Sequence, residues 1–143
     1  MSNNRGSALP IVVIAILLVA VVLVAIATIP STGTIRTLGI EVYSDPAATI
    51  PVASIKWGIL NPGEVAQTTV WLKLTGNTDA NVTMYTTNWV PQSASTYIHL
   101  FWTAEGLMHA GEIKQANITL EVARTIVGIE SFTLDIVINA TAR

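Results

Sequence analysis

The sequence predicts an all-β protein: an immunoglobulin-like antiparallel β-sandwich of about seven strands, preceded by one N-terminal hydrophobic helix. Two observations predict the sandwich. After residue 38, apolar and polar residues alternate with a period of two in short stretches, as half-buried strands require. Turn residues separate these stretches about every 8 to 15 residues, which favours a sandwich over an α/β fold. A third observation, one uncharged apolar run, predicts the helix.

The apolar run from Ala8 to Ile29 is long enough to cross a membrane as a helix. Fifteen of its residues are Leu, Ile or Val, and none is charged. As a helix it would reach about 33 Å, close to the hydrocarbon thickness of a bilayer. The run has no polar face, which argues against a soluble amphipathic helix, and Pro10 suits a first helical turn.

The chain therefore divides into four predicted parts. These are a short tail (1–7), a transmembrane or filament-core helix (8–29), a polar stalk (30–38) and the β-sandwich domain (39–143). We expect a single-pass membrane protein with a cytoplasmic N-terminus and the domain outside, at the cell surface. The expected partners are membrane lipid or neighbouring copies of the same helix, and the chain could form a homo-oligomer or filament.

Three fates of the apolar run remain open. It could be retained as an anchor, or removed as a secretory signal after Ala27, because Ala25-Ile26-Ala27 is a small-x-small site and Arg5 supplies a basic start. The third fate follows from Arg5-Gly6-Ser7-Ala8-Leu9-Pro10, which resembles the leader of archaeal type IV pilins. That resemblance implies cleavage after Gly6 and assembly into a filament through the helix.

The alternating stretches are each bounded by turn residues. They predict strands over residues 39–44, 53–57, 64–75, 81–88, 97–103 and 131–141, and a turn-plus-strand unit over residues 111–122. In the long strand after the Asn61-Pro62-Gly63 turn, Val70, Leu72 and Leu74 share one face. In the last strand, Phe132, Leu134, Ile136 and Ile138 are expected to point inward.

One stretch of the domain is repeated. GEIKQANITLEV (111–122) aligns without a gap with GEVAQTTVWLKL (63–74), at an offset of 48 residues. Two copies are too few for a solenoid, so we expect two equivalent turn-plus-strand units inside one sandwich.

Composition excludes several functions. The chain has 7 basic and 9 acidic residues and a net charge of −2, so it lacks the basic footprint of a nucleic-acid-binding protein. Cysteine is absent, which excludes disulfides and thiolate metal sites. His99 and His109 lack partners at metal-ligand spacing, and no nucleophile-base motif or phosphate loop occurs. We therefore expect no enzyme activity, no metal and no cofactor.

Two kinds of candidate site remain. Asn81, Asn117 and Asn139 begin Asn-x-Thr sequons, and they are candidate N-glycosylation sites if the domain is extracellular. Trp71 stands on the polar face of its predicted strand, so it is a candidate contact for a partner. The other three tryptophans, Trp57, Trp89 and Trp102, are expected to pack in the core or its rim.

Much of the domain resembles a group of small archaeal surface proteins that have one N-terminal membrane helix and one immunoglobulin-like domain. The resemblance lies in SIKWGILNPGE (54–64), GN (76–77), TNWVP (87–91), YIHLFW (97–102) and FTLDI (132–136). The Pro-Gly-Glu turn and its strand are also similar to adhesion-type domains of bacterial and archaeal surface proteins. The resemblance implies a surface location, and the group has no assigned activity from which a site could be transferred.

The preferred hypothesis is a non-enzymatic, membrane-anchored extracellular β-sandwich protein with a structural or interaction role in the cell envelope. One alternative is a pilin-like subunit of an extracellular filament that assembles through the hydrophobic helix. Another is a secreted module that binds a glycan or small ligand.

Overall fold

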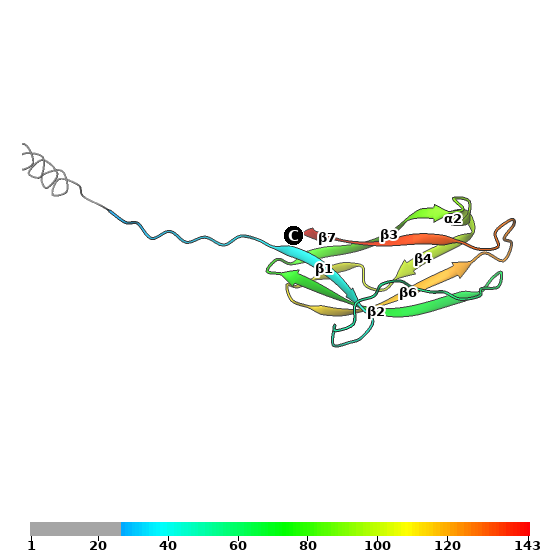
Figure 1. Cartoon of the computed structure of the whole chain (residues 1–143), viewed down its shortest axis with the longest axis horizontal. Coiled ribbons are helices and arrows are strands. Elements are labelled where there is room, and N and C mark those ends of the chain that lie inside the picture. The colour runs from blue at the N-terminus through cyan, green and yellow to red at the C-terminus, as the bar shows by residue number, and fades with distance from the viewer. Residues whose placement is uncertain (1–26) are drawn as a thin grey trace, which may run out of the picture. The chain divides into compact units, whose positions relative to one another are not determined.

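The computed structural model describes residues 27–143, and residues 35–143 form one compact unit (Figure 1). The predicted helix over 8–29 lies outside the described residues, except for residues 27–29, which belong to no helix or strand. A residue that precedes proline avoids the helical region, and Pro30 follows directly. No helix within residues 27–143 combines the length and hydropathy needed to span a membrane.

The described chain consists almost entirely of strands. Its elements are β1 (Leu38–Tyr43), β2 (Val65–Gly76), β3 (Ala80–Val90), α2 (Ala94–Tyr97), β4 (Ile98–Trp102), β5 (Gly106–Met108), β6 (Ile113–Val122) and β7 (Thr133–Ala142). The predicted all-β class is thereby confirmed.

These strands form two antiparallel sheets that pack face to face. The four-stranded sheet has the order β1-β2-β6-β4, and the three-stranded sheet has the order β5-β3-β7. Figure 1 shows the two layers lying one above the other, with β3 and β7 in one and β2 and β6 in the other. The architecture is that of a β-sandwich, as the alternation predicted.

The fully buried side chains come mainly from the central strands β2, β3 and β6. Val70, Leu72 and Leu74 all point into the core, as predicted, and Leu72 is 0% exposed. The other large buried side chains are Val82, Ile98, Met108, Ile118 and Leu120. The period-two pattern therefore identified the buried face of β2 correctly.

The two copies of the sequence repeat are neighbours in the four-stranded sheet. β2 and β6 pair antiparallel, and Thr69 lies opposite Asn117, the residue 48 positions later. Thr69 thus pairs with its own repeat equivalent, and residues on either side pair progressively farther from theirs, so a local two-fold axis passes between Thr69 and Asn117. The Thr69 hydroxyl donates to Asn117 Oδ1 at 2.9 Å across this axis.

The turns that precede the two repeated strands are also equivalent. In the first, the Glu64 N–H donates to the Asn61 carbonyl (3.0 Å); in the second, the Glu112 N–H donates to the His109 carbonyl (3.0 Å). Each Glu carboxylate also accepts the backbone N–H three residues before it. Both turns place glycine at a positive φ, as a type II turn requires: 79° at Gly63 and 77° at Gly111.

The structure differs from the predicted strands in three places. Residues 53–57, expected to be a strand, belong to no strand, although they alternate as one would. The short elements α2 and β5 were not predicted, because three or four residues carry too little periodicity to be recognised.

Replacing Gly111 with alanine tests whether these turns depend on the positive φ. No atom lies within 4 Å of the Cβ that alanine would add, so the expected loss of about 1–2 kcal/mol in unfolding free energy is backbone strain alone. Gly63→Ala should cost at least as much, because its Cβ would lie 3.2 Å from Arg124 Cγ. Denaturant unfolding of the full chain in detergent, followed by tryptophan fluorescence, measures both.

Gly33→Ala is the matched control, since Gly33 has open space around it and no positive φ. Its unfolding free energy should stay within about 0.5 kcal/mol of wild type. If Gly111→Ala were equally harmless, the assignment of the turn would be wrong.

Candidate functional site: an apolar slot between the sheets

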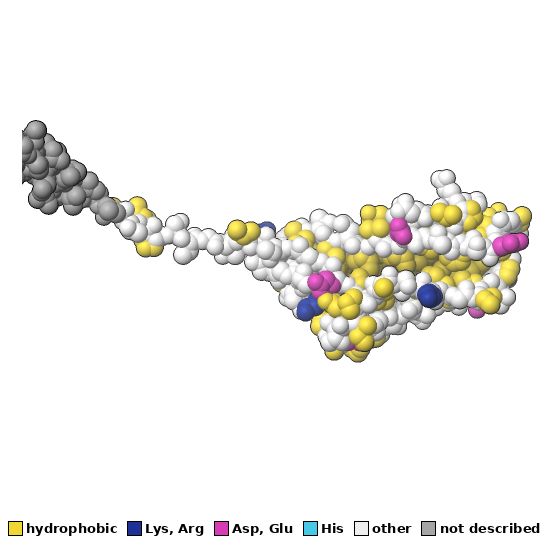
Figure 2. Space-filling view, viewed as in Figure 1, with side chains coloured by type: hydrophobic (Ala, Val, Ile, Leu, Met, Phe, Trp, Pro, Cys, Tyr) yellow, Lys and Arg dark blue, Asp and Glu magenta, His cyan; other side chains and the backbone are white. Residues whose placement is uncertain are grey.

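An apolar slot opens between the two sheets on the side of β1 and β7, with a volume of about 860 Å³. We call it the slot. Its floor comes from the inner face of the four-stranded sheet and one wall from β7. Its main apolar lining residues are Val42, Val70, Ile118, Val122, Leu134, Ile136 and Ile138. Figure 2 shows it as a band of hydrophobic side chains between the two layers, open to the viewer.

The slot exists because the sandwich is closed on one side only. On the side of β4 and β5, the chain crosses between the sheets through residues 103–105, and Ala104 in this crossing is 0% exposed. On the side of β1 and β7, no described strand joins the two sheets. The inward side chains of β7, such as Leu134 and Ile136, point toward the core as predicted but are only half-buried.

Two stretches of backbone without ladder partners border the slot. One is β7, which pairs with β3 on one side and with no described strand on the other. The other is residues 53–60, which we call the strap. Within the described chain, the strap forms no backbone hydrogen bond. Since backbone N–H and C=O groups are usually paired in folded proteins, it is notable that β7 and the strap both have backbone groups without a strand partner within residues 27–143.

The strap is fixed at both ends. At its start, the Val52 N–H donates to the Val42 carbonyl (3.0 Å), and Pro51 forms an isolated bridge with Tyr43. At its end, the type II turn at Asn61 leads into β2. Between these ends, Ile55 and Trp57 point toward the core cluster, whereas Ile59 is 95% exposed. Residues 53–57 of the strap therefore have the side-chain alternation of a strand. The alternation ends at Gly58, where φ is positive (74°), and Ile59 points outward.

The loop before the strap is held together by the Asp45 carboxylate. Asp45 accepts hydrogen bonds from the Thr49 hydroxyl (2.5 Å), the Thr49 N–H (2.9 Å) and the Ile50 N–H (2.8 Å). These bonds favour the charged form, so they hold the pKa of Asp45 below its ordinary value, with the Thr49 hydroxyl as the largest cause. The carboxylate thereby sets where the strap begins.

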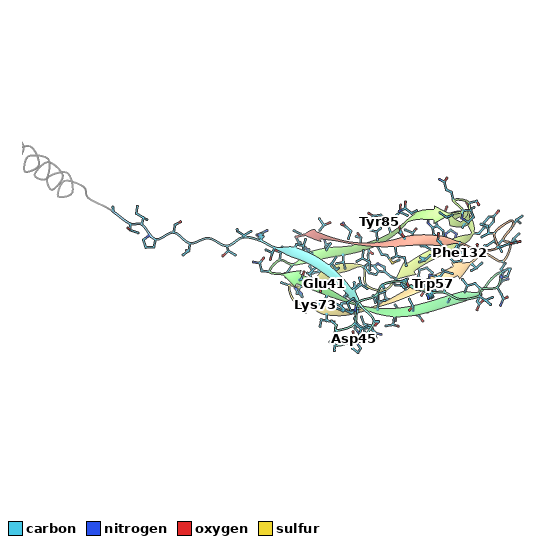
Figure 3. The ribbon with its side chains drawn as sticks, in the orientation of Figure 1. Glu41, Asp45, Trp57, Lys73, Tyr85 and Phe132 are labelled. Atoms are coloured by element: carbon cyan, nitrogen blue, oxygen red, sulfur yellow. The ribbon has the colours of Figure 1, made fainter. Side chains whose placement is uncertain are left out.

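Aromatic side chains occupy one end of the slot. Trp57 from the strap and Phe132, directly before β7, both line it, and Figure 3 shows them near the same end. The rings of Phe132 and Trp89 stack with centroids 6.3 Å apart. Trp89 Nε1 donates to the Thr86 hydroxyl at 3.2 Å, so its polar atom is satisfied. As predicted, these tryptophans pack at the rim of the core, as Trp102 also does.

Trp71, the predicted partner contact, lies away from the slot on the outer face of the four-stranded sheet. It sits opposite Tyr43 on β1 and opposite Gln115 on β6, and it is half-buried by its surroundings. The sequence therefore placed Trp71 on the correct face. Whether a partner binds there stays a prediction.

The three sequons fall on two different surfaces. Asn81 and Asn139 are exposed on the outer face of the three-stranded sheet, where Asn81 pairs with Thr141 and Thr83 pairs with Asn139. These two sequons are therefore immediate neighbours. Asn117 is half-buried at the centre of the four-stranded sheet, where Thr69 donates to its side chain. A glycan has most room at Asn81 and Asn139.

The histidines are both exposed and lie apart from the slot. His109 Nδ1 lies 3.3 Å from Asp79 Oδ2, and the Ala110 N–H donates to the other oxygen of the same carboxylate (2.8 Å). These contacts lower the pKa of Asp79, the Ala110 N–H being the largest cause. Within residues 27–143, no three His, Cys, Asp or Glu residues are grouped closely enough to hold a metal ion.

The fold and the slot define a β-sandwich domain with an incompletely covered interior. No family model matches the chain, and no curated protein matches it. The slot was not predicted from the sequence. Residues 53–57 and 131–141, which border the slot, alternate in the sequence. Neither pattern shows which strand edges remain unpaired.

The Asp45 hydrogen bonds predict a pH dependence of the loop before the strap. Because the folded-state pKa is lowered, their stabilisation is present above the ordinary value of about 4 and is lost as the pH falls through the folded pKa. In Asp45→Ala, the Thr49 and Ile50 amides should lose hydrogen-exchange protection at pH 6. The difference from wild type should shrink toward pH 3.

Asp135→Ala is the control for this measurement. Asp135 accepts only the Asn88 side-chain amide (2.8 Å), so its removal should leave protection at Thr49 and Ile50 unchanged at every pH. A loss of protection in Asp45→Ala that did not depend on pH would contradict the assignment to the ionised carboxylate.

Proposed function

We propose that this chain is a non-enzymatic, membrane-anchored extracellular β-sandwich protein with a structural or interaction role in the cell envelope, which it performs by binding an extended polypeptide in the slot. The slot is the observation that carries the proposal. It combines an apolar floor with free backbone on both sides, and an added β-strand needs both features.

The chemistry of the slot favours a strand over a compact ligand. A strand inserted between β7 and the strap would pair its backbone with theirs, while every second side chain would enter the apolar floor. The half-buried residues Leu134, Ile136 and Ile138 are spaced at two residues along β7, which matches that alternation. The expected ligand is therefore a polypeptide that alternates apolar and polar residues.

The location rests on sequence features that agree with this role. The apolar run from Ala8 to Ile29 supports a membrane anchor, and the exposed sequons at Asn81 and Asn139 support an extracellular domain. An anchored domain with a strand-accepting slot would join to neighbouring proteins at the surface, which is an interaction role without catalysis.

Binding in the slot can be followed by the fluorescence of Trp57. A ten-residue peptide that alternates isoleucine and threonine should shift the emission of the full chain at low concentration, because it covers the half-exposed indole. Trp57→Phe should lose most of this response. Trp71→Phe should keep it, since Trp71 lies on the outer face. An unchanged response in Trp57→Phe would place the peptide elsewhere.

The anchor is tested separately with two lysines in the apolar run. In Val19→Lys/Val22→Lys, each charge costs about 2.5–3.5 kcal/mol at the centre of a membrane helix, so the protein should leave the membrane fraction. A Ser2→Lys control, outside the run, should remain in the membrane fraction. Wild-type protein found wholly in the supernatant after cell lysis would refute anchoring, and the mass of its N-terminus would then identify cleavage after Gly6 or Ala27.

A further inference from the structure

We propose that the slot of one molecule receives residues 28–37 of a second copy of this chain as an added β-strand, so that copies join head to tail. We call residues 28–37 the donor segment. This inference rests on the proposed function, because it names the polypeptide that the slot binds.

The strand order indicates that the slot lies where an immunoglobulin-type sandwich has its seventh strand. In a seven-stranded immunoglobulin-type sandwich, one sheet contains the first, second, fifth and fourth strands, and the other contains the third, sixth and seventh. The order β1-β2-β6-β4 follows the first sheet, and β3 with β7 takes the places of the third and sixth strands. Among the described residues, no strand lies beside β7 where the seventh would be, since β5 pairs on the far side of β3.

The donor segment has the length that this place requires. It contains ten residues, and so does β7, along which it would pair. At about 3.3 Å per residue, both reach roughly 33 Å when extended. Residues 28–37 belong to no helix or strand, and all of them are exposed. Within the described chain, residues 28–34 form no backbone hydrogen bond, whereas the backbone of Ile35 and Thr37 bonds Asn77.

The donor segment also has the required alternation. Ile29, Ser31, Gly33 and Ile35 would share the face that enters the slot, and Ile29 and Ile35 are 86% and 82% exposed. The opposite face would present threonines and Arg36 to water. Pro30 falls near the start of the strand, where its missing N–H costs least. The rest of the apolar run has no polar face at all, so it suits this position less well. With Thr28 and Ile29 in the donor segment, residues 8–27 remain for the anchor, and as a helix they would still reach about 30 Å.

The connection to β1 favours a second copy over the chain's own slot. The Thr37 N–H donates to Asn77 Oδ1 (2.9 Å), and Asn77 Nδ2 donates to the Ile35 carbonyl (3.1 Å). Leu38 already pairs with Gly76. The backbone is therefore held at residues 35 to 38, where it would have to reverse direction to enter its own slot. A reversal at Gly33 would leave only residues 28–32, about half a strand.

An exchange of this kind has a predictable symmetry. The donor segment and the slot are different surfaces, so the contact is heterologous: each molecule donates to the next and accepts from the one before. Such contacts build rings or open filaments. The filament proposed here is joined through β-strands, in contrast to a pilin-like filament joined through the hydrophobic helices.

Cross-linking tests the pairing directly, because the chain contains no cysteine of its own. Thr32→Cys, on the outward face of the donor segment, is mixed with an affinity-tagged Val137→Cys chain under mild oxidation. Val137 is the middle of β7 on its outer face, so a mixed disulfide dimer is expected. Tyr85→Cys is the matched control, since Tyr85 lies opposite Val137 but on β3, one strand farther from the slot. Equal cross-linking to both positions would overturn the inference.

Substitutions in the donor segment test its apolar face. Ile29→Asp/Ile35→Asp should weaken self-association of the full chain in detergent by about a hundredfold or more, because burial of two isoleucines is lost. Thr28→Asp/Thr34→Asp adds the same charge on the opposite face and should leave association nearly unchanged. Sedimentation measures the oligomeric state of each. If both variants, or neither, became monomeric, the inference would fail.

Peptides separate the two proposals. A peptide of residues 28–37 should compete with association and shift the Trp57 emission of the Ile29→Asp/Ile35→Asp chain, whose slot is free. If the isoleucine-threonine peptide bound and the peptide of residues 28–37 did not, the proposed function would stand and the inference would be wrong. If neither peptide bound, both would be wrong.

Discussion

The pairing of β2 with β6 is the interaction on which the rest of the structure depends. These strands carry the two copies of the repeat, and the pair has a local two-fold axis between Thr69 and Asn117. Their inward faces supply Leu72, Leu74 and Leu120, all fully buried. The outer strands β1 and β4 add to this pair, and the second sheet covers its inner face. The repeat also dictates the two type II turns, because each strand enters through the same Gly-Glu sequence.

The incomplete edge of the sandwich follows from what lies outside this central pair. β1 pairs with β2 only from Trp71 to Gly76, so the half of β2 before Trp71 has no strand partner on that side. The strap passes beside this half, held by the Asp45 loop at one end and the Asn61 turn at the other. On the opposite sheet, β7 is an edge strand. Two incomplete edges that face each other across an apolar floor together make the slot.

Sequence periodicity predicted which side chains of single strands face the core, and it did not predict which strands pair. Strands such as β2, β6 and β7 were found because burial of one face imposes a period of two on each of them separately. The same reasoning predicted a strand over residues 53–57, where alternation is present and pairing is absent. Alternation reports which side chains face the core, whereas pairing depends on which edge lies alongside. The slot depends on which strand edges remain unpaired, so it could not be predicted from any single segment of the sequence. Trp71 illustrates the same limit, since its face was predicted and its half-burial by neighbours on two other strands was not.

An open apolar slot beside a free strand edge is a hazard for any protein, because it invites pairing with whatever extended chain is nearby. Natural sheets normally protect such edges with charged side chains, bulges or covering loops. Here the hydrophobic positions of β7 remain aliphatic up to the opening, and residues 53–57 of the strap keep the alternation of a strand. The aliphatic positions of β7 and the unpaired strap both lower the solubility of the protein unless the slot is filled. Among residues 27–143, a segment of suitable length and alternation precedes β1, and every copy of the chain carries it. The slot of one molecule and the donor segment of another each expose apolar side chains and unpaired backbone. When the donor segment binds in the slot, both become covered, which is a physical reason for the sandwich to lack one strand.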